Sequence, residues 1–126
     1  MSRPVELADV AERIEQFGPV ATLVTVTDDG RPHVVSVLVA VHGRRLAVEA
    51  GSRTCENVRA NPTVTLTWTR DGEDYQLIVD GQAAVSDRPV AEGLLAVDID
   101  VQSGILHRVA DRPGAGPTCV PLSSRA

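Results

Sequence analysis

The sequence lacks lysine altogether and has few aromatic residues. All 12 of its basic side chains are arginines, and phenylalanine, tryptophan and tyrosine occur once each. Without lysine the chain cannot form a Schiff base with a carbonyl substrate, and an anion site must use arginine, backbone N–H groups or hydroxyls. Lysine-based covalent catalysis is therefore excluded.

Long apolar runs and basic runs are also missing. No apolar stretch reaches the roughly 20 residues that a membrane-spanning helix needs, and the N-terminal residues do not form an apolar signal core. The formal net charge is −5 and the sequence pI is about 5.1, so a phosphate-rich polymer would meet a repulsive average field. We therefore expect a cytoplasmic protein with no membrane or nucleic-acid partner.

Residue patterns typical of metal sites and of hydrolases are absent. Cys55 and Cys119 lie far apart with no CxxC pair and no adjacent histidine, so neither a zinc site nor a disulfide framework is indicated. His33, His42 and His107 show no HxH or HExxH spacing, and no Ser-His-Asp order, P-loop or GxGxxG occurs. We predict no metal site, and no residue stands out as a general acid or base.

Length and hydrophobic periodicity predict one mainly β domain over residues 1–126. The chain has 126 residues, of which 43% are hydrophobic and 23% charged, and this composition suits one compact core. Apolar residues at three- and four-residue steps predict an N-terminal helix within residues 1–17, ended by Gly18-Pro19. β-Branched residues and turn signals then predict strands at residues 20–27, 34–41, 46–50, 63–69 and 75–85, with Gly81 as a candidate bulge.

Two helical segments interrupt the barrel core that we expect over residues 20–100. A hydroxyl residue precedes a short helical stretch that ends at Asn61-Pro62, and Pro89 with spaced apolar residues predicts a second brief helix over residues 87–96. After Asp100 the pattern weakens, so residues 101–126 are expected to be loop-rich, with a possible edge strand at residues 119–122. Together these signals predict a small, mainly antiparallel barrel or sandwich with two or three short helices.

Residues 51–61 are the most informative segment for function. Ser52, Arg53 and Thr54 lie at the start of the predicted helical turn, where free N–H groups and the positive end of the helix dipole suit an anion. A guanidinium beside two hydroxyls would bind a phosphate. The alternative is that a hydroxyl only caps the helix and that Arg53 is a solvated surface charge.

Three motifs occur in an order that is typical of a known family. They are Asp29-Gly30-Arg31-Pro32-His33 before a strand, Gly51-Ser52-Arg53-Thr54 with Asn57 and Asn61-Pro62, and the strand that begins Tyr75-Gln76-Leu77-Ile78. With these motifs the chain resembles the pyridoxamine 5′-phosphate oxidase-like, flavin-binding split β-barrel superfamily. The resemblance implies an antiparallel split barrel of six or seven strands. It also implies a homodimer with two cofactor sites at the subunit interface, each holding FMN or the deazaflavin coenzyme F-420.

The same resemblance implies a role for individual residues. Ser52 and Arg53 match the phosphate-binding turn, with Thr54 beside them, and Gln76 matches a polar contact to the cofactor. The walls of the flavin site match Val35, Ser36, Val37 and Leu38 on one strand and Ala47 and Val48 on the next. Two departures remove positive charge, because Val35 stands where the best-known oxidases have a second phosphate-binding arginine and Thr54 where they have lysine.

The function implied by the resemblance is that of a flavin- or deazaflavin-dependent oxidoreductase acting on a small molecule. In such an enzyme the protein positions the cofactor, and the cofactor carries hydride or electrons. This division of labour agrees with a sequence that offers no clear acid or base. The alternative is a non-catalytic barrel that binds, stores or senses a flavin, haem or another planar ligand.

Overall fold

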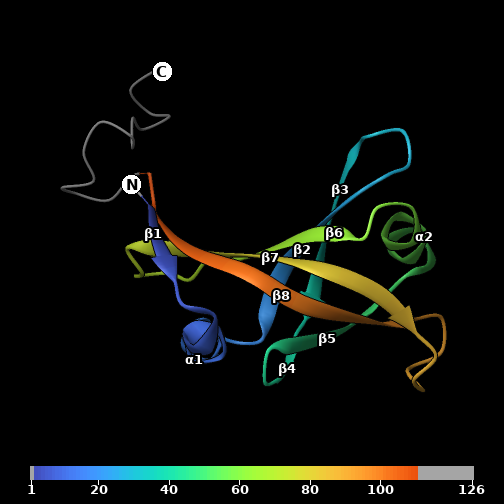
Figure 1. Cartoon of the computed structure of the whole chain (residues 1–126), viewed down its shortest axis with the longest axis horizontal. Helices are drawn as coiled ribbons and strands as arrows, with labels where there is room; N and C mark the ends of the chain where they lie inside the picture. The colour runs from blue at the N-terminus through green and yellow to red at the C-terminus, as the bar shows by residue number, and fades with distance from the viewer. Residues whose placement is uncertain (1, 111–126) are drawn as a thin grey trace.

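A single antiparallel sheet dominates the computed structural model, which describes residues 2–110 (Figure 1). In chain order the elements are β1 (Ser2–Val5), the 3-10 helix η1 (Leu7–Asp9), α1 (Val10–Phe17), β2 (Val20–Val26), β3 (Pro32–Leu38), β4 (Ala40–His42), β5 (Arg45–Ala50), α2 (Ser52–Ala60), β6 (Thr63–Trp68), β7 (Tyr75–Ser86) and β8 (Leu95–Arg108). Seven strands follow the spatial order β3-β2-β6-β7-β8-β5-β4, and β1 pairs separately with β8. The predicted fold class, mainly β and antiparallel with short helices, is confirmed.

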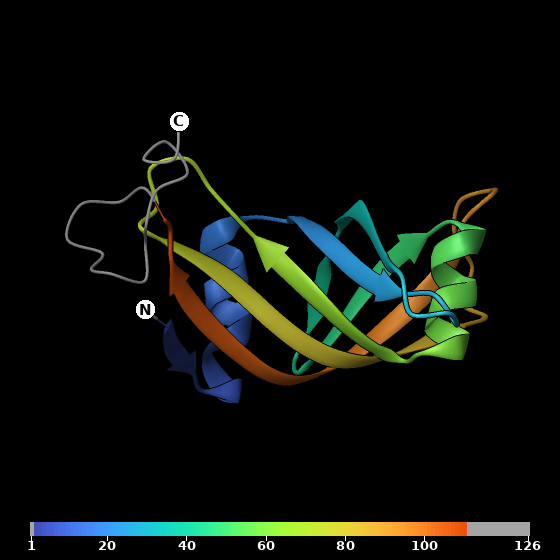
Figure 2. The ribbon, with the colours of Figure 1, turned by 90° about the horizontal axis from the view of Figure 1, so that it is seen from above.

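The sheet curls on itself, and the two α-helices lie at opposite ends of it (Figure 2). The sheet can curl because β8 is long enough for its two halves to pair with different strands. Its first half pairs with β5, from Leu95 opposite Ala50 to Asp100 opposite Arg45, and its second half pairs with β1. One strand therefore holds both the N-terminal segment and the β4–β5 hairpin.

Strands that alternate in burial supply most of the core. In β6 the side chains of Val64, Leu66 and Trp68 are buried, and the threonines between them are half-buried or exposed. Trp68 also donates a hydrogen bond from Nε1 to the carbonyl oxygen of Gly18, at 3.1 Å, so β6 is tied to the end of α1. The alternation expected from the sequence therefore places the single tryptophan in the core.

Gly81 is the position of the predicted bulge. The register between β7 and β8 shifts between Asp80 and Gly81. A Cβ atom at this position would lie 2.7 Å from the carbonyl oxygen of Asp100, so only glycine fits the close approach of the two strands. This prediction is confirmed.

The apolar run at residues 34–41 is two strands, not one as predicted. β3 ends at Leu38 and pairs with β2, whereas β4 starts at Ala40 and pairs with β5. Between them, the backbone N–H of Val39 donates to the carbonyl oxygen of Pro19, at 2.8 Å. The chain thus passes from one edge of the sheet to the other at this point.

The helix predicted over residues 87–96 and the loop-rich region predicted from residue 101 are wrong for the described residues. Residues 87–94 form an irregular connection, and β8 then runs without interruption from Leu95 to Arg108. Burial of Val97, Ile99 and Val101 has the two-residue period of a strand, which overrides the proline signal. The N-terminal helix is divided into η1 and α1, and β1 was not predicted. The possible edge strand at residues 119–122 lies outside the described residues.

Candidate functional site

A groove runs between β3 and β5 from the start of α2 toward β4. It consists of three adjoining hollows of about 480, 330 and 280 Å³. The first and second share Ser36, Val37 and Leu94, and the second and third share Leu38. Glu49 borders all three, so they form one continuous surface depression.

The start of α2 forms one end of the groove and carries unpaired N–H groups. Gly51 is the N-cap, and within the described chain no side chain caps the helix, so the predicted hydroxyl cap is wrong. The first intrahelical bond runs from the N–H of Cys55 to the carbonyl oxygen of Gly51, at 3.2 Å. The preceding N–H groups therefore remain available to an anion in the first hollow, which Ser52, Arg53 and Thr54 border.

The charge of Arg53 is available as well. Its side chain is exposed and forms no ion pair with any described residue. Ser52 is also exposed, but only 3% of the Thr54 surface is accessible. Arg53 and Ser52 can therefore contact a ligand with their side chains, whereas Thr54 contributes mainly its backbone.

Two asparagines fix α2 against the barrel. Asn57 is 5% exposed and donates from Nδ2 to Oγ1 of the fully buried Thr25, at 3.1 Å. Asn61 donates from Nδ2 to the carbonyl oxygens of Val26, at 3.3 Å, and Thr27, at 2.9 Å. Because these bonds connect the helix to β2 and the residue after it, they set the position of the anion-binding end relative to the sheet.

Strands β3 and β5 form the walls of the groove, and most of the residues on these walls are apolar. Val35 and Val37 border the first hollow, and Leu38, Ala47 and Val48 border the third. Leu38 is 68% exposed, an unusual state for a large apolar side chain in a strand. This combination suits a flat, largely apolar ring lying beyond an anionic group.

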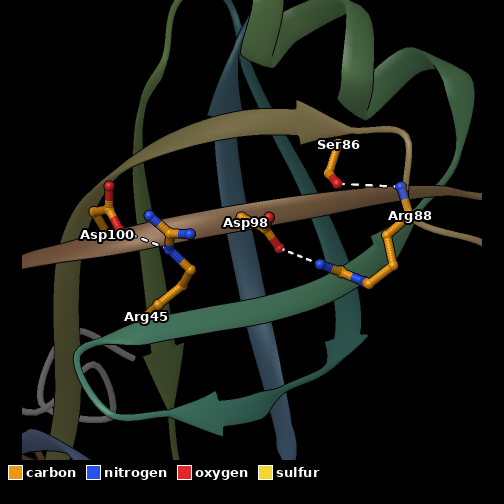
Figure 3. A network of polar contacts seen from close by, with 5 residues as sticks. All are labelled: Arg45, Ser86, Arg88, Asp98 and Asp100. Carbon is orange, nitrogen blue, oxygen red and sulfur yellow. Dashed lines mark hydrogen bonds and ion pairs between the residues drawn. The ribbon is translucent and has the colours of Figure 1, made fainter.

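The irregular segment 87–94 borders the groove on the β5 side and is fixed by polar contacts. The N–H of Ala91 donates to Oε1 of Glu49, at 3.2 Å. Arg88 pairs with Asp98 of β8, with 2.5 Å between Nη1 and Oδ1 (Figure 3). Arg88 also lines the third hollow. A second pair joins Arg45 of β5 to Asp100 of β8, at 3.0 Å (Figure 3). Neither of its residues borders any of the three hollows.

Nine of the ten site residues predicted from the sequence border this groove. They are Val35, Ser36, Val37, Leu38, Ala47, Val48, Ser52, Arg53 and Thr54. Gln76 does not, because it is the second residue of β7 and lies opposite His107 of β8. Ser86, at the other end of β7, lies ten residues from Gln76, and at about 3.3 Å per residue this separation corresponds to roughly 30 Å along the strand.

Glu49, Arg88 and Leu94 also border the groove and were not among the predicted site residues. Glu49 continues the outward alternation of β5 after Ala47, so the two-residue period could have identified it. Arg88 and Leu94 come from the segment that was predicted to be helical, and no local pattern places them beside β5. His33 also borders the first hollow.

The described residues do not include a metal cluster or an activated thiol. No group of three or more His, Cys, Asp or Glu side chains within residues 2–110 is placed to hold a metal ion. Burial raises the pKa of the Cys55 thiol, which favours the neutral form over the nucleophilic thiolate.

The sequence profile of the family described as pyridoxamine 5′-phosphate oxidase matches residues 8–120. The chain belongs to this family. A comparison with curated proteins found no match. Within residues 2–110, no helix has the length and apolar character to cross a membrane.

Solved structures with the same fold include proteins that are associated with different ligands. An FAD-binding protein from Mesorhizobium loti is 19% identical with a TM-score of 0.64, covering 84% of this chain and 98% of that one. A protein described as an F420 reductase is 19% identical with a TM-score of 0.59, covering 69% and 90%. HutZ, a haem storage protein from Vibrio cholerae, is 15% identical with a TM-score of 0.64, covering 82% and 97%. At these identities the likeness establishes the split-barrel fold of the pyridoxamine 5′-phosphate oxidase family.

Proposed function

We propose that this protein is a cytoplasmic oxidoreductase that uses FMN or the deazaflavin coenzyme F-420 to act on a small molecule. One observation carries the proposal, namely that the uncapped start of α2 and the unpaired Arg53 lie at one end of an apolar-walled groove. Membership of the pyridoxamine 5′-phosphate oxidase family supports it. The likeness to an FAD-binding protein and to an F420 reductase supports a ligand of the flavin or deazaflavin type.

In this proposal each part of the groove has a separate task. The guanidinium of Arg53, the hydroxyl of Ser52 and the N–H groups at the start of α2 hold the phosphate. The side chains of Leu38 and Ala47 exclude water from the ring and orient it along the groove. When bound, the cofactor supplies hydride or electron transfer, for which these side chains have no equivalent.

The fit to FMN has one chemical weakness. Val35 borders the first hollow. It stands where the resemblance to the best-known oxidases implies a second phosphate-binding arginine, so the phosphate would gain one guanidinium rather than two. Each charge-assisted hydrogen bond contributes about 1.5–3 kcal/mol, or about one to two decades of affinity. We therefore expect FMN to bind weakly and F-420 to bind more tightly.

We also propose that the active form is a homodimer with a cofactor at each subunit interface. Val20 and Leu38 are opposite each other on β2 and β3 and are 57% and 68% exposed, and Val34 is 60% exposed. A second copy would cover this apolar surface. It would also give Gln76, which lies away from the groove of its own chain, a route to the groove of its partner. Light scattering at micromolar concentration should give twice the 13.4 kDa chain mass, and a monomeric mass would refute the shared site.

A non-catalytic carrier of a planar ligand is the second candidate. The likeness to HutZ favours it. Haem carries two propionate groups, which could use the same anion-binding end.

Titration of the purified protein with FMN, F-420 and haem separates the two candidates. Visible absorbance and fluorescence report binding, and turnover of reduced cofactor with candidate electron acceptors reports activity. Saturable binding of FMN or F-420 is the expected result. Binding of haem alone would favour the carrier, and failure of both FMN and F-420 to bind would refute the oxidoreductase.

A further inference from the structure

Glu49 is the one residue that borders all three hollows of the groove. It lies on the outward face of β5, next to Ala47 in the two-residue alternation, and its side chain is exposed. The hydrogen bond from the N–H of Ala91 to its Oε1 atom holds the carboxylate beside the groove. A ligand that extends from α2 toward β4 must therefore pass close to this carboxylate.

The charge of Glu49 is not neutralised within the described residues. The ion pairs there join Arg31 to Asp29, Arg45 to Asp100 and Arg88 to Asp98, and none involves Glu49. Arg88 borders the same third hollow, but its charge is already opposed by Asp98. Arg53 lies at the phosphate end, and the two other titratable neighbours, His33 and His42, border opposite hollows. The middle of the groove thus has an excess negative charge.

We propose that Glu49 makes the groove discriminate against a bound ring that carries negative charge, so that it holds oxidised flavin more tightly than reduced flavin. This inference rests on the proposed function, since it concerns the flavin-type ligand of the same groove. When the flavin ring accepts two electrons and one proton at N5, above the ring's own pKa, a negative charge remains on its N1–C2=O edge. The phosphate is unchanged, so only groups near the ring distinguish the two states.

The expected size of the discrimination follows from Coulomb's law. Two like charges a few ångströms apart at a protein surface interact with an effective dielectric constant between that of water and about 20. This interaction corresponds to about a tenfold difference in affinity between the two redox states. For a two-electron couple, tenfold corresponds to a lowering of the bound reduction potential by about 30 mV.

The test compares the wild type with Glu49→Gln, Glu49→Ala and a matched control. Glu49→Gln removes the charge and keeps an oxygen that can accept from Ala91, whereas Glu49→Ala removes both. Glu12→Gln on the exposed face of α1 makes the same change in net charge away from the groove. Dissociation constants for FMN are measured at pH 8 and low salt, oxidised in air and reduced with excess dithionite under argon. The midpoint potential of bound FMN gives an independent value of the same ratio.

We expect the ratio of the reduced to the oxidised dissociation constant to fall about tenfold in both Glu49 variants and to stay unchanged in Glu12→Gln. The potential of bound FMN should rise by about 30 mV in the two Glu49 variants. If the ratio of dissociation constants changes in Glu49→Ala but not in Glu49→Gln, the discrimination depends on the anchoring of segment 87–94 and not on the charge of Glu49. That result would overturn the proposal. Normal FMN binding with no shift in either variant would refute the role of Glu49 alone. Absence of FMN binding in either redox state of the wild type would refute the proposed FMN site and this inference with it.

Discussion

Replacing Arg53 by alanine tests the phosphate end of the groove directly. Arg53 is the second residue of α2, is exposed, and has no ion-pair partner among the described residues. In the free protein its positive charge lies at the positive end of the helix dipole, an arrangement that costs about 0.3–1 kcal/mol. Arg53→Ala should therefore leave the free energy of unfolding unchanged or raise it slightly.

Affinity for the cofactor should change far more. Loss of one charge-assisted hydrogen bond to phosphate, about 1.5–3 kcal/mol, raises the dissociation constant by about one to two decades. Raising the ionic strength should weaken wild-type binding more than Arg53→Ala binding, because salt screens the contact that the variant lacks. Fluorescence titration with FMN and F-420 measures both effects, and urea unfolding of the free proteins measures stability.

Arg59→Ala is the matched control for this experiment. Arg59 is exposed on the last turn of the same helix and does not border the groove. Its positive charge lies at the negative end of the helix dipole and stabilises the helix there. Its removal should therefore lower the free energy of unfolding by about 0.3–1 kcal/mol and leave the dissociation constant of the cofactor unchanged. The two variants should thus show opposite patterns. Equal dissociation constants for the wild type and Arg53→Ala would show that Arg53 is only a solvated surface charge and would refute the phosphate site.

Two further predictions concern the support of α2. Asn57→Ala should lower the free energy of unfolding by about 1–3 kcal/mol, measured by urea titration, because it leaves the buried Thr25 hydroxyl without its hydrogen-bond donor; a loss below about 0.5 kcal/mol would contradict this reason. In a Cys119→Ser background, Cys55 should react with Ellman's reagent at pH 8 only after unfolding, since burial raises the pKa of its thiol. The neutral Cys55 thiol stabilises the folded protein fully below the ordinary thiol pKa of about 8.5, and this stabilisation is lost as the pH rises from that pKa to the raised pKa of the folded state. Rapid labelling of the folded protein would refute the burial.

Local pattern was sufficient to predict the strands whose two faces differ. In β6, apolar side chains alternate with threonine, and the structure buries the apolar set and leaves the threonines half-buried or exposed. Turns were predicted by glycine at positions that need a left-handed backbone, such as Gly30 with φ of 89° and Gly72 with φ of 86°. Alternation within a strand and glycine at a turn both depend on residues close together in the chain, so they can be recognised from the sequence alone.

Elements stabilised by distant partners were missed for the opposite reason. β1 has exposed or half-buried side chains and exists because it pairs with the second half of β8. That half of β8 has its own weak pattern around Gln102 and Ser103, but neighbours on both sides hold it as a strand. Gly104 is buried there, and a Cβ atom at this position would lie only 3.1 Å from Cγ2 of Val10. No local periodicity reports such long-range contacts.

The groove depends on a feature that local pattern could not show, the break after Leu38. If residues 34–41 formed one strand, as their composition suggests, Leu38 and Val39 would continue along β2. Instead the N–H of Val39 bonds to Pro19, and the chain joins β5 at the other edge of the sheet. This crossing leaves β3 and β5 as facing walls without shared backbone pairing, and the hollows lie between them. Motif order could therefore indicate the residues of the wall, whereas Glu49 and segment 87–94, which determine the charge of the groove, required the three-dimensional arrangement.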